Sequence, residues 1–360
     1  MSRDRDPLKI SRARLARRIK SLRGRRLGVV GDFMLDRYVL GTASRLSPEA
    51  AVPVVDFVEE SDCLGGAGNV AANLAALGAQ VVCFGAAGTD AAAGRLRQRL
   101  RDTGIDDRDI LRDGSRKTTL KTRIIARHQQ VVRVDRETRA PLSRPLEEKL
   151  IRRVMAGLRR LDVLVVSDYD KGVVSEELAL RVLSACERLR IPVFVKPKWS
   201  MLATYPGATV IVLNRAEAGF LVTRPLDDEE SVRQAGQQLL EKFKCQAVIL
   251  TRGQQGLNVF EQGEPRGLHI SATSRDVPFG LGVDRRQASQ AVGRQVFDVT
   301  GAGDTVLATL ALAVAAGASI REAAVLGNAA AGVAVGKLGT GTVSPAELLA
   351  AVQEAASASV

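Results

Sequence analysis

Short apolar segments alternate with amphipathic helical segments along most of this chain. The apolar segments predict buried strands at 26–32, 81–85, 163–168, 192–195, 209–213 and 247–251. Hydrophobic residues recur with the helical period over 69–77, 92–101, 145–160, 175–189, 216–221 and 230–243. Strands that are apolar throughout and are separated by helices are typical of a parallel sheet covered on both faces. The pattern therefore predicts an α/β fold that binds its ligands beyond the C-terminal ends of the strands.

Two regions depart from this alternation of strands and helices. Residues 52–60 alternate between apolar and polar positions, and the pair 117–126 and 131–135 does the same. Such alternation predicts antiparallel strands with one covered face. We place them in a small β-sheet lid over the strand ends, with lid segments at about 38–62 and 116–136. The alternative is that they are edge strands of the main sheet.

The composition is that of a protein with a full hydrophobic core. The chain has 360 residues, 46% of them hydrophobic, which suffices for one large domain. We expect that domain over 26–350, after a basic extension at 1–25 and before a tail at 351–360. No uninterrupted apolar run reaches the roughly 18 residues that cross a bilayer, and the four cysteines lack metal-ligand spacing. We expect a cytoplasmic protein with reduced thiols and no membrane span.

The positive charge is concentrated at the N-terminus. Residues 1–26 hold eleven Lys/Arg and two Asp, a net +9, so only +3 of the total +12 belongs to the rest. Leu15, Ala16, Ile19 and Leu22 fall on one helical face, which predicts a short helix packed on the body. Contact with RNA or an anionic membrane surface is the alternative. Three tyrosines and one tryptophan offer little for stacking bases, so the sequence argues against a nucleic-acid partner.

The most informative segment is Thr300-Gly301-Ala302-Gly303-Asp304, followed at once by an apolar helical run. Its two glycines allow a tight turn, and unpaired N–H groups at a helix start form an anion site. A carboxylate base beside such a site suits phosphoryl transfer to a hydroxyl group. The alternative is that Asp304 only caps the helix.

A second glycine cluster, Leu64-Gly65-Gly66-Ala67-Gly68-Asn69, opens the helix predicted at 69–77. Adjacent glycines admit a ligand close to the backbone, and Asn69 can both donate to and accept from a sugar hydroxyl. A tight turn before a core helix is the alternative. The segment 332–337 is not a Walker loop, because its spacing is one residue short.

The two glycine clusters, in this order and with the α/β pattern between them, resemble the motifs of the ribokinase-like (PfkB) carbohydrate kinases. The resemblance covers roughly residues 26–350. It implies a three-layer α/β/α sandwich with a mainly parallel central sheet and a small β-sheet lid. It also implies an ATP-dependent kinase in which Asp304 takes the proton of the acceptor hydroxyl. The N–H groups of Gly301, Ala302 and Gly303 then hold charge on the moving phosphoryl group.

Four further segments, 31–38, 44–55, 167–172 and 335–340, are similar to the D-glycero-D-manno-heptose 7-phosphate kinases. This narrower resemblance implies phosphorylation of the anomeric hydroxyl to the 1,7-bisphosphate, in ADP-heptose synthesis for lipopolysaccharide. Many members carry a C-terminal nucleotidyltransferase, for which we expect no room here. We therefore expect a stand-alone kinase with a separate adenylyltransferase partner, and a homodimer formed through the lid strands.

On the nucleotide side, the resemblance assigns Asn214 and Glu217 to Mg²⁺ through water, within the family's Asn-x-x-Glu motif. A helix start with an acid in its first turn is the alternative. The residues expected around ATP and Mg²⁺ are Asn214, Arg215, Ala216, Glu217, Thr251, Arg252, Gly253, Gly256, Asn328, Gly336 and Lys337.

On the sugar side, the resemblance implies hydroxyl contacts from carboxylates at strand ends and phosphate contacts from lid cations. The expected residues are Asp32, Asp36, Arg45, Gly65, Gly66, Asn69, Lys121, Arg123, Arg133, Asp168 and Lys171. The cations proposed for the distal phosphate are Lys121, Arg123 and Arg133, because a bidentate arginine–phosphate pair is strong. A solvated strand face is the alternative for these three.

The chain departs from the narrower family after the strand at 192–195. That family usually has Val-Asp-Pro-Lys-Gly there, whereas this chain places Lys196 at the acid and Trp199 at the glycine. The polar segment 274–292, upstream of Asp304, is also atypical. Two rivals follow: a kinase for another sugar or sugar phosphate, and a catalytically weak nucleotide-sensing or RNA-associated protein on the same fold.

Overall fold

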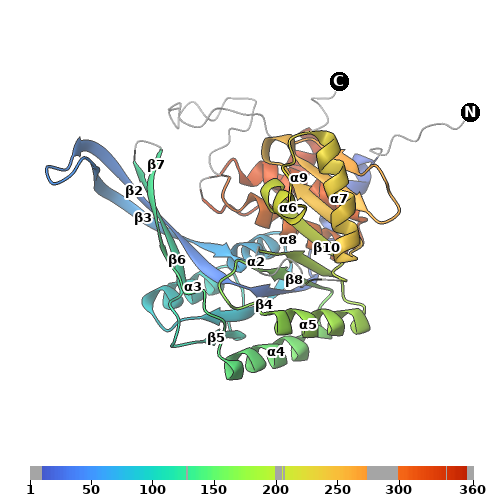
Figure 1. Ribbon diagram of the computed structural model, residues 1–360, viewed down its shortest axis with the longest axis horizontal. Helices are drawn as coiled ribbons and strands as arrows, with labels where there is room; N and C mark the ends of the chain where they lie inside the picture. The colour runs from blue at the N-terminus through green and yellow to red at the C-terminus, as the bar shows by residue number, and fades with distance from the viewer. Residues whose placement is uncertain are drawn as a thin grey trace, which may run out of the picture.

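The central feature of the structure, a computed structural model, is a large twisted sheet (Figure 1). The structure describes residues 10–126, 129–198, 205, 207–273, 299–337 and 339–354. In spatial order the strands of this sheet are β13 (Leu268–Ile270), β12 (Leu257–Glu261), β11 (Ala247–Thr251), β10 (Val210–Asn214), β9 (Val193–Lys196), β8 (Val163–Ser167), β1 (Arg26–Gly31), β4 (Gln80–Ala87) and β5 (Ile110–Arg112). Neighbours from β11 to β5 are parallel, whereas β12 pairs antiparallel with both β11 and β13.

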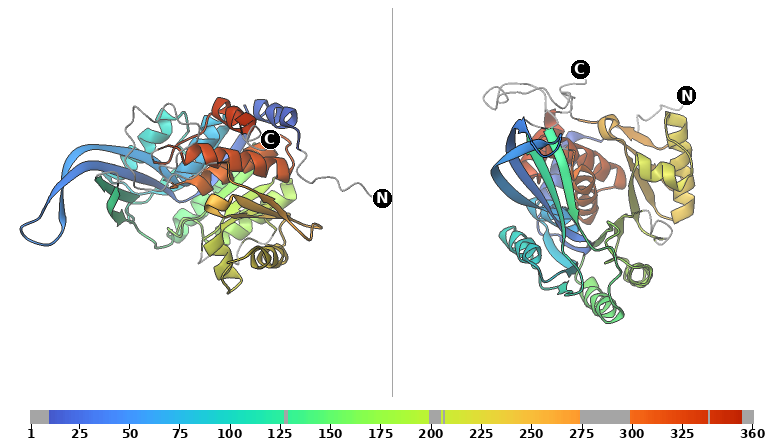
Figure 2. Two further views of the ribbon diagram at one scale, coloured as in Figure 1. Left: turned by 90° about the horizontal axis from the view of Figure 1, so that it is seen from above. Right: turned by 60° about the vertical axis from the view of Figure 1, so that its left-hand side comes forward.

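Helices cover both faces of this sheet, as Figures 1 and 2 show. The helices on one face are α1 (Arg12–Lys20), α2 (Ala67–Ala76), α3 (Ala91–Asp102), α8 (Ala302–Ala315), α9 (Ile320–Ala334) and α10 (Pro345–Glu354). The helices on the other face are α4 (Arg144–Leu158), α5 (Glu176–Leu189), α6 (Arg215–Leu221) and α7 (Glu229–Phe243). Within β1, Leu27 and Val29 face the first layer and Val30 faces the second. The three-layer α/β/α arrangement confirms the predicted fold class.

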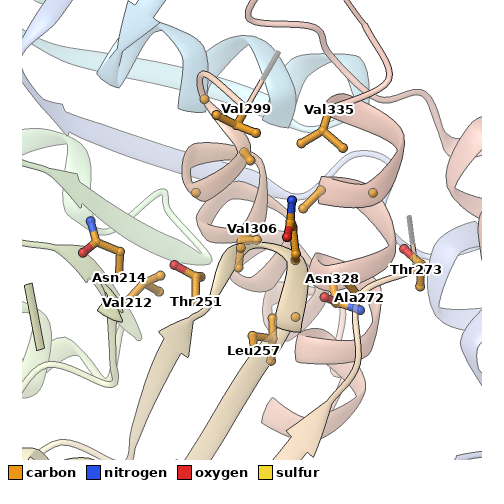
Figure 3. A pocket seen from close by; sticks show the side chains of 18 of the residues that line it. Val212, Asn214, Thr251, Leu257, Ala272, Thr273, Val299, Val306, Asn328 and Val335 are labelled. Carbon is orange, nitrogen blue, oxygen red and sulfur yellow. The ribbon is translucent and has the colours of Figure 1, made fainter. Parts of the chain in front are cut away.

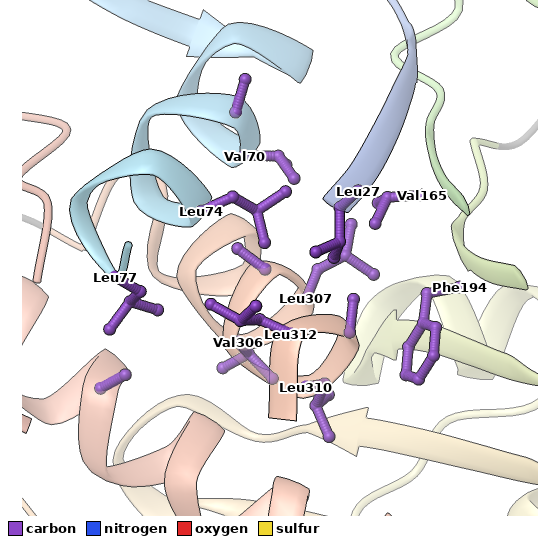
Figure 4. Close-up of a cluster of buried hydrophobic side chains, with 14 of the residues drawn as sticks. Leu27, Val70, Leu74, Leu77, Val165, Phe194, Val306, Leu307, Leu310 and Leu312 are labelled. Carbon is purple, nitrogen blue, oxygen red and sulfur yellow. The ribbon is translucent and has the colours of Figure 1, made fainter. Parts of the chain in front are cut away.

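Helix α8 lies in the middle of the first layer and is buried nearly all round. Ten consecutive residues, Asp304 to Ala313, are buried. Leu307, Leu310 and Leu312 pack with Leu74 of α2 and with Phe194 of β9 in one cluster (Figure 4). Each buried leucine contributes about 1.5–3 kcal/mol of hydrophobic stabilisation. The N-terminus of α8, where Asp304 lies, is therefore held by the core.

A second sheet forms the lid. Its strand order is β3 (Pro53–Gly66), β2 (Phe33–Leu46), β6 (Thr119–Ala126) and β7 (Gln129–Arg136). The long β2–β3 hairpin projects from the body in Figures 1 and 2. Because these strands pair with one another and not with the main sheet, the edge-strand alternative is wrong. Strand β2 was not predicted, because its first four residues are all buried and show no alternation.

The N-terminal helix α1 packs on the body through the predicted apolar face. Leu15, Ile19 and Leu22 are buried in the core cluster of the first layer. Arg14 and Arg18 form ion pairs with the buried Glu322 of α9. The packing interpretation of this basic segment is confirmed for residues 12–22.

Three parts of the chain named in the sequence analysis, Trp199, the segment 274–292 and the tail beyond 354, lie outside the described residues. Within the described residues, no helix has the length and apolar character that crossing a membrane requires.

Candidate active site

The two glycine clusters meet at Asp304. Gly66 is the N-cap of α2 and Gly301 is the N-cap of α8, both with positive φ. The side-chain amide of Asn69 donates to Asp304 Oδ2 at 3.1 Å and lies 3.5 Å from the Gly301 carbonyl. A Cβ at Gly301, whose φ is +82°, would lie 2.4 Å from Asn69 Nδ2, so close approach and backbone conformation both require glycine. Asn69 thus orients the expected base.

The carboxylate of Asp304 is buried and accepts from three different elements. Besides Asn69, the Tyr169 hydroxyl donates to Oδ1 at 2.6 Å, and Lys196 Nζ lies 2.7 Å from the same oxygen. Asp304 is only 2% exposed. Since its oxygens accept from side chains on other elements, Asp304 does more than cap α8.

Lys196 and Tyr169 form one unit with Asp304. The ammonium of Lys196 lies 3.1 Å from the Tyr169 hydroxyl and 5.2 Å from the centre of its ring. Burial alone would lower the pKa of Lys196, but the neighbouring Asp304 carboxylate and Tyr169 raise it above its usual value. Burial and the Asp304 charge raise the pKa of the Tyr169 hydroxyl as well. Lys196 therefore stays charged and Tyr169 stays a donor near neutral pH.

Sequence reasoning did not assign a role to Tyr169, and it treated Lys196 only as a departure. Tyr169 lies two residues beyond the end of β8 and Lys196 is the last residue of β9. These neighbouring parallel strands end at the same edge of the sheet. A strand-end position was the available signal for both.

The N-terminus of α8 offers fewer free donors than expected. The Ala302 N–H donates to the Val299 carbonyl at 3.3 Å, so it is not free. The Gly303 N–H has no hydrogen bond to the described residues. A Cβ at Gly303 would lie 3.2 Å from Lys196 Nζ, which places the ammonium over the first turn of the helix.

A cavity of about 410 Å³ opens beside this turn (Figure 3). The expected residues that line it are Asn214, Thr251, Gly253, Gly256, Gly301, Ala302, Gly303 and Asn328. Much of the remaining wall is apolar, as Val212, Leu257 and Val306 in Figure 3 illustrate, and Lys196 also lines it. The side-chain amide of Asn328 donates to the Ser271 carbonyl at 2.8 Å. A cavity of mostly apolar walls with a few polar groups is typical of a nucleotide site.

Six expected nucleotide residues do not line this cavity: Glu217, which is described below, and the five that follow. Arg215 and Ala216 line a separate open cavity of about 780 Å³ beside α6, because the helix turns them away. Arg252 is paired with Glu229 and Asn258. Lys337 is paired with Glu347 and the Thr342 carbonyl, and Gly336 precedes it in the turn after α9. The structure gives these five residues other neighbours, and their contact with ATP stays a prediction.

Glu217 is engaged within the protein on both carboxylate oxygens. Oε2 accepts the Asn214 N–H at 2.9 Å, while Asn214 Oδ1 accepts the Glu217 N–H at 2.8 Å. Oε1 is paired with Lys198. This is a capping box at the start of α6, the alternative given above. The described residues also contain no cluster of three or more His, Cys, Asp or Glu that could hold a metal.

On the sugar side, Asp32 anchors the loop that carries Tyr169. It accepts the N–H groups of Tyr169 at 2.8 Å, Lys171 at 3.2 Å and Val173 at 3.3 Å. Burial, and then the nearby Asp168 charge, raise the pKa of Asp32 to about 6. Asp168 is also buried and accepts from the Tyr205 hydroxyl at 3.1 Å. Asp32 therefore positions the loop after β8, and its contact with a sugar hydroxyl stays a prediction.

Asp36 and Arg123 form a buried pair across the lid strands β2 and β6. The guanidinium of Arg123 donates to Asp36 Oδ1 and lies 5.4 Å from the Tyr38 ring centre. Burial raises the pKa of Asp36, although Arg123 opposes this effect. A Cβ at Gly65 would lie 2.3 Å from Asp36 Oδ2. The glycine thus makes room for the carboxylate, and the guanidinium of Arg123 is directed to Asp36 and to the Tyr38 ring.

The remaining lid cations share two carboxylates. Lys121 lies 3.0 Å from Asp135 and 3.5 Å from Glu137, and Lys171 lies 2.9 Å from Glu137. Arg133 pairs with Asp135 on the exposed strand β7. The structure brings Lys121 to Lys171, which was expected separately at a strand end, and leaves the Arg133 side chain half exposed beside them.

Arg45 lies apart from this site. It is exposed, and it pairs with Val54 near the far end of the β2–β3 hairpin, which projects from the body (Figure 1). Within this chain Arg45 therefore does not join the residues around Asp304, and its contact with the sugar stays a prediction.

Comparison with known proteins supplies the family. The model of the pfkB family of carbohydrate kinases matches residues 26–347. The protein named bifunctional protein HldE from Geotalea uraniireducens is 42% identical over 94% of this chain and 64% of its own length. The HldE of Trichlorobacter lovleyi is 43% identical over 90% of this chain and 62% of its own length. The chain thus spans less than two thirds of these curated relatives.

Solved structures show the same fold at low sequence identity. Ribokinase of Arabidopsis thaliana, complexed with ribose and ATP, has a TM-score of 0.69 at 20% identity, covering 92% of this chain and 99% of that one. Phosphofructokinase-2 of Escherichia coli, in complex with potassium, has a TM-score of 0.71 at 19% identity, with the same coverage of both chains.

Proposed function

The chain belongs to the pfkB family of carbohydrate kinases, and from this premise we propose that it phosphorylates a heptose 7-phosphate. The reaction is transfer of the terminal phosphoryl group of ATP to the anomeric hydroxyl of D-glycero-D-manno-heptose 7-phosphate. Its product is the 1,7-bisphosphate, which would enter ADP-heptose synthesis for lipopolysaccharide.

The observation that carries this proposal is the place of Asp304 in the first turn of α8, beside the nucleotide cavity. Its carboxylate contacts Asn69 and Tyr169, neither of which lines that cavity. The anomeric oxygen attacks the γ-phosphorus, its proton passes to Asp304, and the bond from the γ-phosphorus to the β–γ bridging oxygen breaks. ADP leaves with that bond's electron pair. Catalysis of this kind consists of positioning and electrostatic stabilisation.

Mg²⁺ does not find a direct protein site among the residues expected to hold it. Both oxygens of Glu217 have partners, and the Asn214 side-chain oxygen caps α6. The described residues therefore do not fit direct coordination, and we derive no step through the metal.

The charges on the sugar side support a phosphorylated acceptor. Lys121, Lys171 and Arg133 surround only Asp135 and Glu137, which leaves an excess of positive charge among these five side chains. A dianionic phosphate can take the place of a carboxylate at such cations through charge-assisted hydrogen bonds. We assign the distal phosphate of the heptose to Lys121 and Lys171.

Two observations support a heptose over a pentose or a fructose phosphate. The segments 31–38, 44–55, 167–172 and 335–340 resemble those of heptose 7-phosphate kinases. The HldE relatives are 42–43% identical to this chain, whereas the ribokinase and phosphofructokinase-2 structures are 19–20% identical.

The test is incubation with ATP and D-glycero-D-manno-heptose 7-phosphate, followed by phosphorus NMR of the product. We expect a new anomeric phosphate signal beside the retained 7-phosphate signal. Fructose 6-phosphate, ribose and a nucleoside serve as comparison acceptors, and Asp304→Asn serves as the inactive control. Faster turnover of any comparison acceptor would replace the heptose assignment. Nucleotide binding without transfer to any acceptor would favour the nucleotide-sensing rival.

We also propose a homodimer formed through the lid. The lid exposes apolar side chains at Leu46, Val52, Phe57, Val58, Val131, Val132 and Val134. Most of them lie on β3 and β7, the two edge strands of the lid sheet, and an edge strand with exposed apolar side chains can pair with another chain. Sedimentation of the protein and of Phe57→Asp tests this: we expect a dimer that the charge weakens, and a wild-type monomer at all concentrations would contradict it.

A further inference from the structure

Lys196 occupies the boundary between the expected base and the nucleotide cavity. Its ammonium lies 2.7 Å from Asp304 Oδ1, and the residue also lines the cavity beside α8. An acid stands at this position in the narrower family that the sequence resembles. A carboxylate there would repel Asp304, so this chain has a different electrostatic arrangement at the point of transfer.

The ammonium retains the capacity to bind a further group. A lysine has three N–H donors, and the described residues supply acceptors for two of them, Asp304 Oδ1 at 2.7 Å and the Tyr169 hydroxyl at 3.1 Å. The side chain of Lys196 is 14% exposed, and the residue lines the cavity.

The position of the ammonium relative to α8 indicates which group it would meet. The ammonium lies 3.2 Å from where a Cβ of Gly303 would stand, over the first helical turn. The N-terminus of a helix attracts anions, because its N–H groups are unpaired and its dipole is positive there. An anion bound to the Gly303 N–H would thus lie within reach of Lys196.

We propose that Lys196 is a catalytic residue of this chain, which binds the transferable phosphoryl group of ATP with its third N–H while it holds Asp304. The inference rests on the proposed phosphoryl transfer at Asp304. During the transfer, negative charge develops on the β–γ bridging oxygen and the phosphoryl oxygens, and the ammonium stabilises it. The proton of the acceptor hydroxyl still goes to Asp304, and Lys196 neither gains nor loses a proton.

Binding of the phosphoryl group also serves the base. While the Lys196 ammonium contacts only Asp304 and Tyr169, its whole positive charge stabilises the Asp304 carboxylate. The carboxylate is then a weak proton acceptor. Once a phosphoryl group shares that charge, Asp304 becomes a stronger proton acceptor. The arrangement therefore couples the activity of the base to the presence of ATP.

The experiment compares Lys196→Met with Lys196→Arg and with the exposed-lysine control Lys149→Met. We expect Lys196→Met to lower kcat by roughly a hundredfold, as for loss of one preorganised charge-stabilising donor. We expect Lys196→Arg to retain more activity than Lys196→Met, and Lys149→Met to match the wild type.

Nucleotide binding supplies a readout that needs no sugar. We expect Lys196→Met to weaken binding of a non-hydrolysable ATP analogue but to leave ADP binding close to wild type, because only the former carries the γ-phosphate. Equal weakening of both nucleotides would overturn the proposal, and so would a wild-type kcat in Lys196→Met. If Lys196→Met does not fold, Lys196→Gln, which lacks the charge but keeps a donor, is judged by the same two criteria.

The variant Lys196→Asp restores the acid of the narrower family. It distinguishes the proposal from the opposite interpretation, in which Lys196 suppresses the activity of Asp304. If Lys196 merely silences Asp304, Lys196→Asp should be more active than the wild type, and that result would overturn the proposal. Failure of the proposed function looks different. In that case the wild type would not phosphorylate heptose 7-phosphate, while the ATP analogue would still lose affinity relative to ADP in Lys196→Met.

Discussion

The nucleotide side and the sugar side of Asp304 differ in structure: the first is an open cavity and the second is a set of ion pairs. On the nucleotide side there is an open cavity of about 410 Å³, with many apolar and glycine residues in its wall. On the sugar side, Asp36 pairs with Arg123, Lys121 pairs with Asp135, and Lys171 pairs with Glu137. The nucleotide side therefore offers space, whereas the charged side chains of the sugar side are paired with one another.

This difference has a consequence for specificity. A nucleotide can enter a preformed cavity with little rearrangement, so its affinity depends on shape and on a few polar contacts. A sugar phosphate must exchange ion pairs that the protein makes with itself. Acceptors without a phosphate cannot compensate for the lost pairs, so the sugar side discriminates by charge.

The largest expected effect lies where the two sides meet. We expect Asp304→Asn to lower kcat by at least about a thousandfold, because general-base catalysis contributes roughly 10²–10⁴ and no other described carboxylate contacts the same point. ADP binding should be largely intact, since the nucleotide cavity does not include the Asp304 side chain. Calorimetry with ADP and steady-state kinetics measure the two quantities. A variant with most of its activity would remove the base assignment.

The next effect tests whether the sugar side recognises phosphate. We expect Lys121→Met to raise the KM for heptose 7-phosphate by roughly tenfold or more, the value of one hydrogen bond to a charged group. The KM for the unphosphorylated heptose should change less. Lys117→Met, an exposed lysine just before β6, is the matched control. Equal changes for both sugars would show that Lys121 does not hold the distal phosphate.

A smaller effect tests the nucleotide side. Asn328 is buried in the cavity wall and donates to the Ser271 carbonyl at 2.8 Å. We expect Asn328→Ala to weaken ADP binding about fivefold, equivalent to about 1 kcal/mol for one net hydrogen bond, with little change in kcat at saturating ATP. Asn328→Asp, which loses the donor but keeps the shape, should weaken binding at least as much. An unchanged ADP affinity in both variants would place the base of the nucleotide elsewhere.

The sequence predicted the fold better than it predicted the contacts of charged side chains. The main strands and the two glycine turns follow from local patterns, because apolar periodicity and glycine conformations are local properties. The roles of Asp32 and Glu217 did not follow, since a carboxylate at a strand end can face a ligand or a backbone N–H. Here Asp32 accepts from the loop after β8, and Glu217 accepts from its own helix start. The long strand β2 was missed because burial on both faces removes the alternation.

The contacts of Lys196 could not be predicted from the sequence either. As a departure from a family pattern it lowered the expectation of heptose kinase activity, because sequence alone cannot tell what a substituted residue touches. The structure places its ammonium on the very carboxylate that the other motif identifies as the base. A departure from a motif gains a chemical meaning only when its partners are known.

The smallest expected effect concerns the ion pair between Lys337 and Glu347, neither of which lines the nucleotide cavity. Lys337 was expected at the nucleotide, but it pairs with Glu347 at 2.7 Å, and Glu347 Oε2 accepts the Ser344 N–H at 2.8 Å before α10. Burial acts against ionisation of Glu347, yet Lys337 and Ser344 outweigh it and lower the pKa of Glu347 from 4.5 to about 2. The stabilisation is therefore present above pH 4.5 and is lost as the pH falls towards 2.

Glu347→Gln keeps the side-chain shape and removes the charge. We expect it to lower the free energy of unfolding at pH 7 by no more than about 1 kcal/mol, since 42% of the Glu347 side chain is exposed and solvent screens the pair. Denaturant unfolding should show the difference from wild type narrowing as the pH falls from about 4.5, while ADP affinity at pH 7 stays the same. A loss of ADP affinity without a loss of stability would return Lys337 to the nucleotide site. In that event the preformed cavity would also depend on an ion pair, and the contrast between the two sides would weaken.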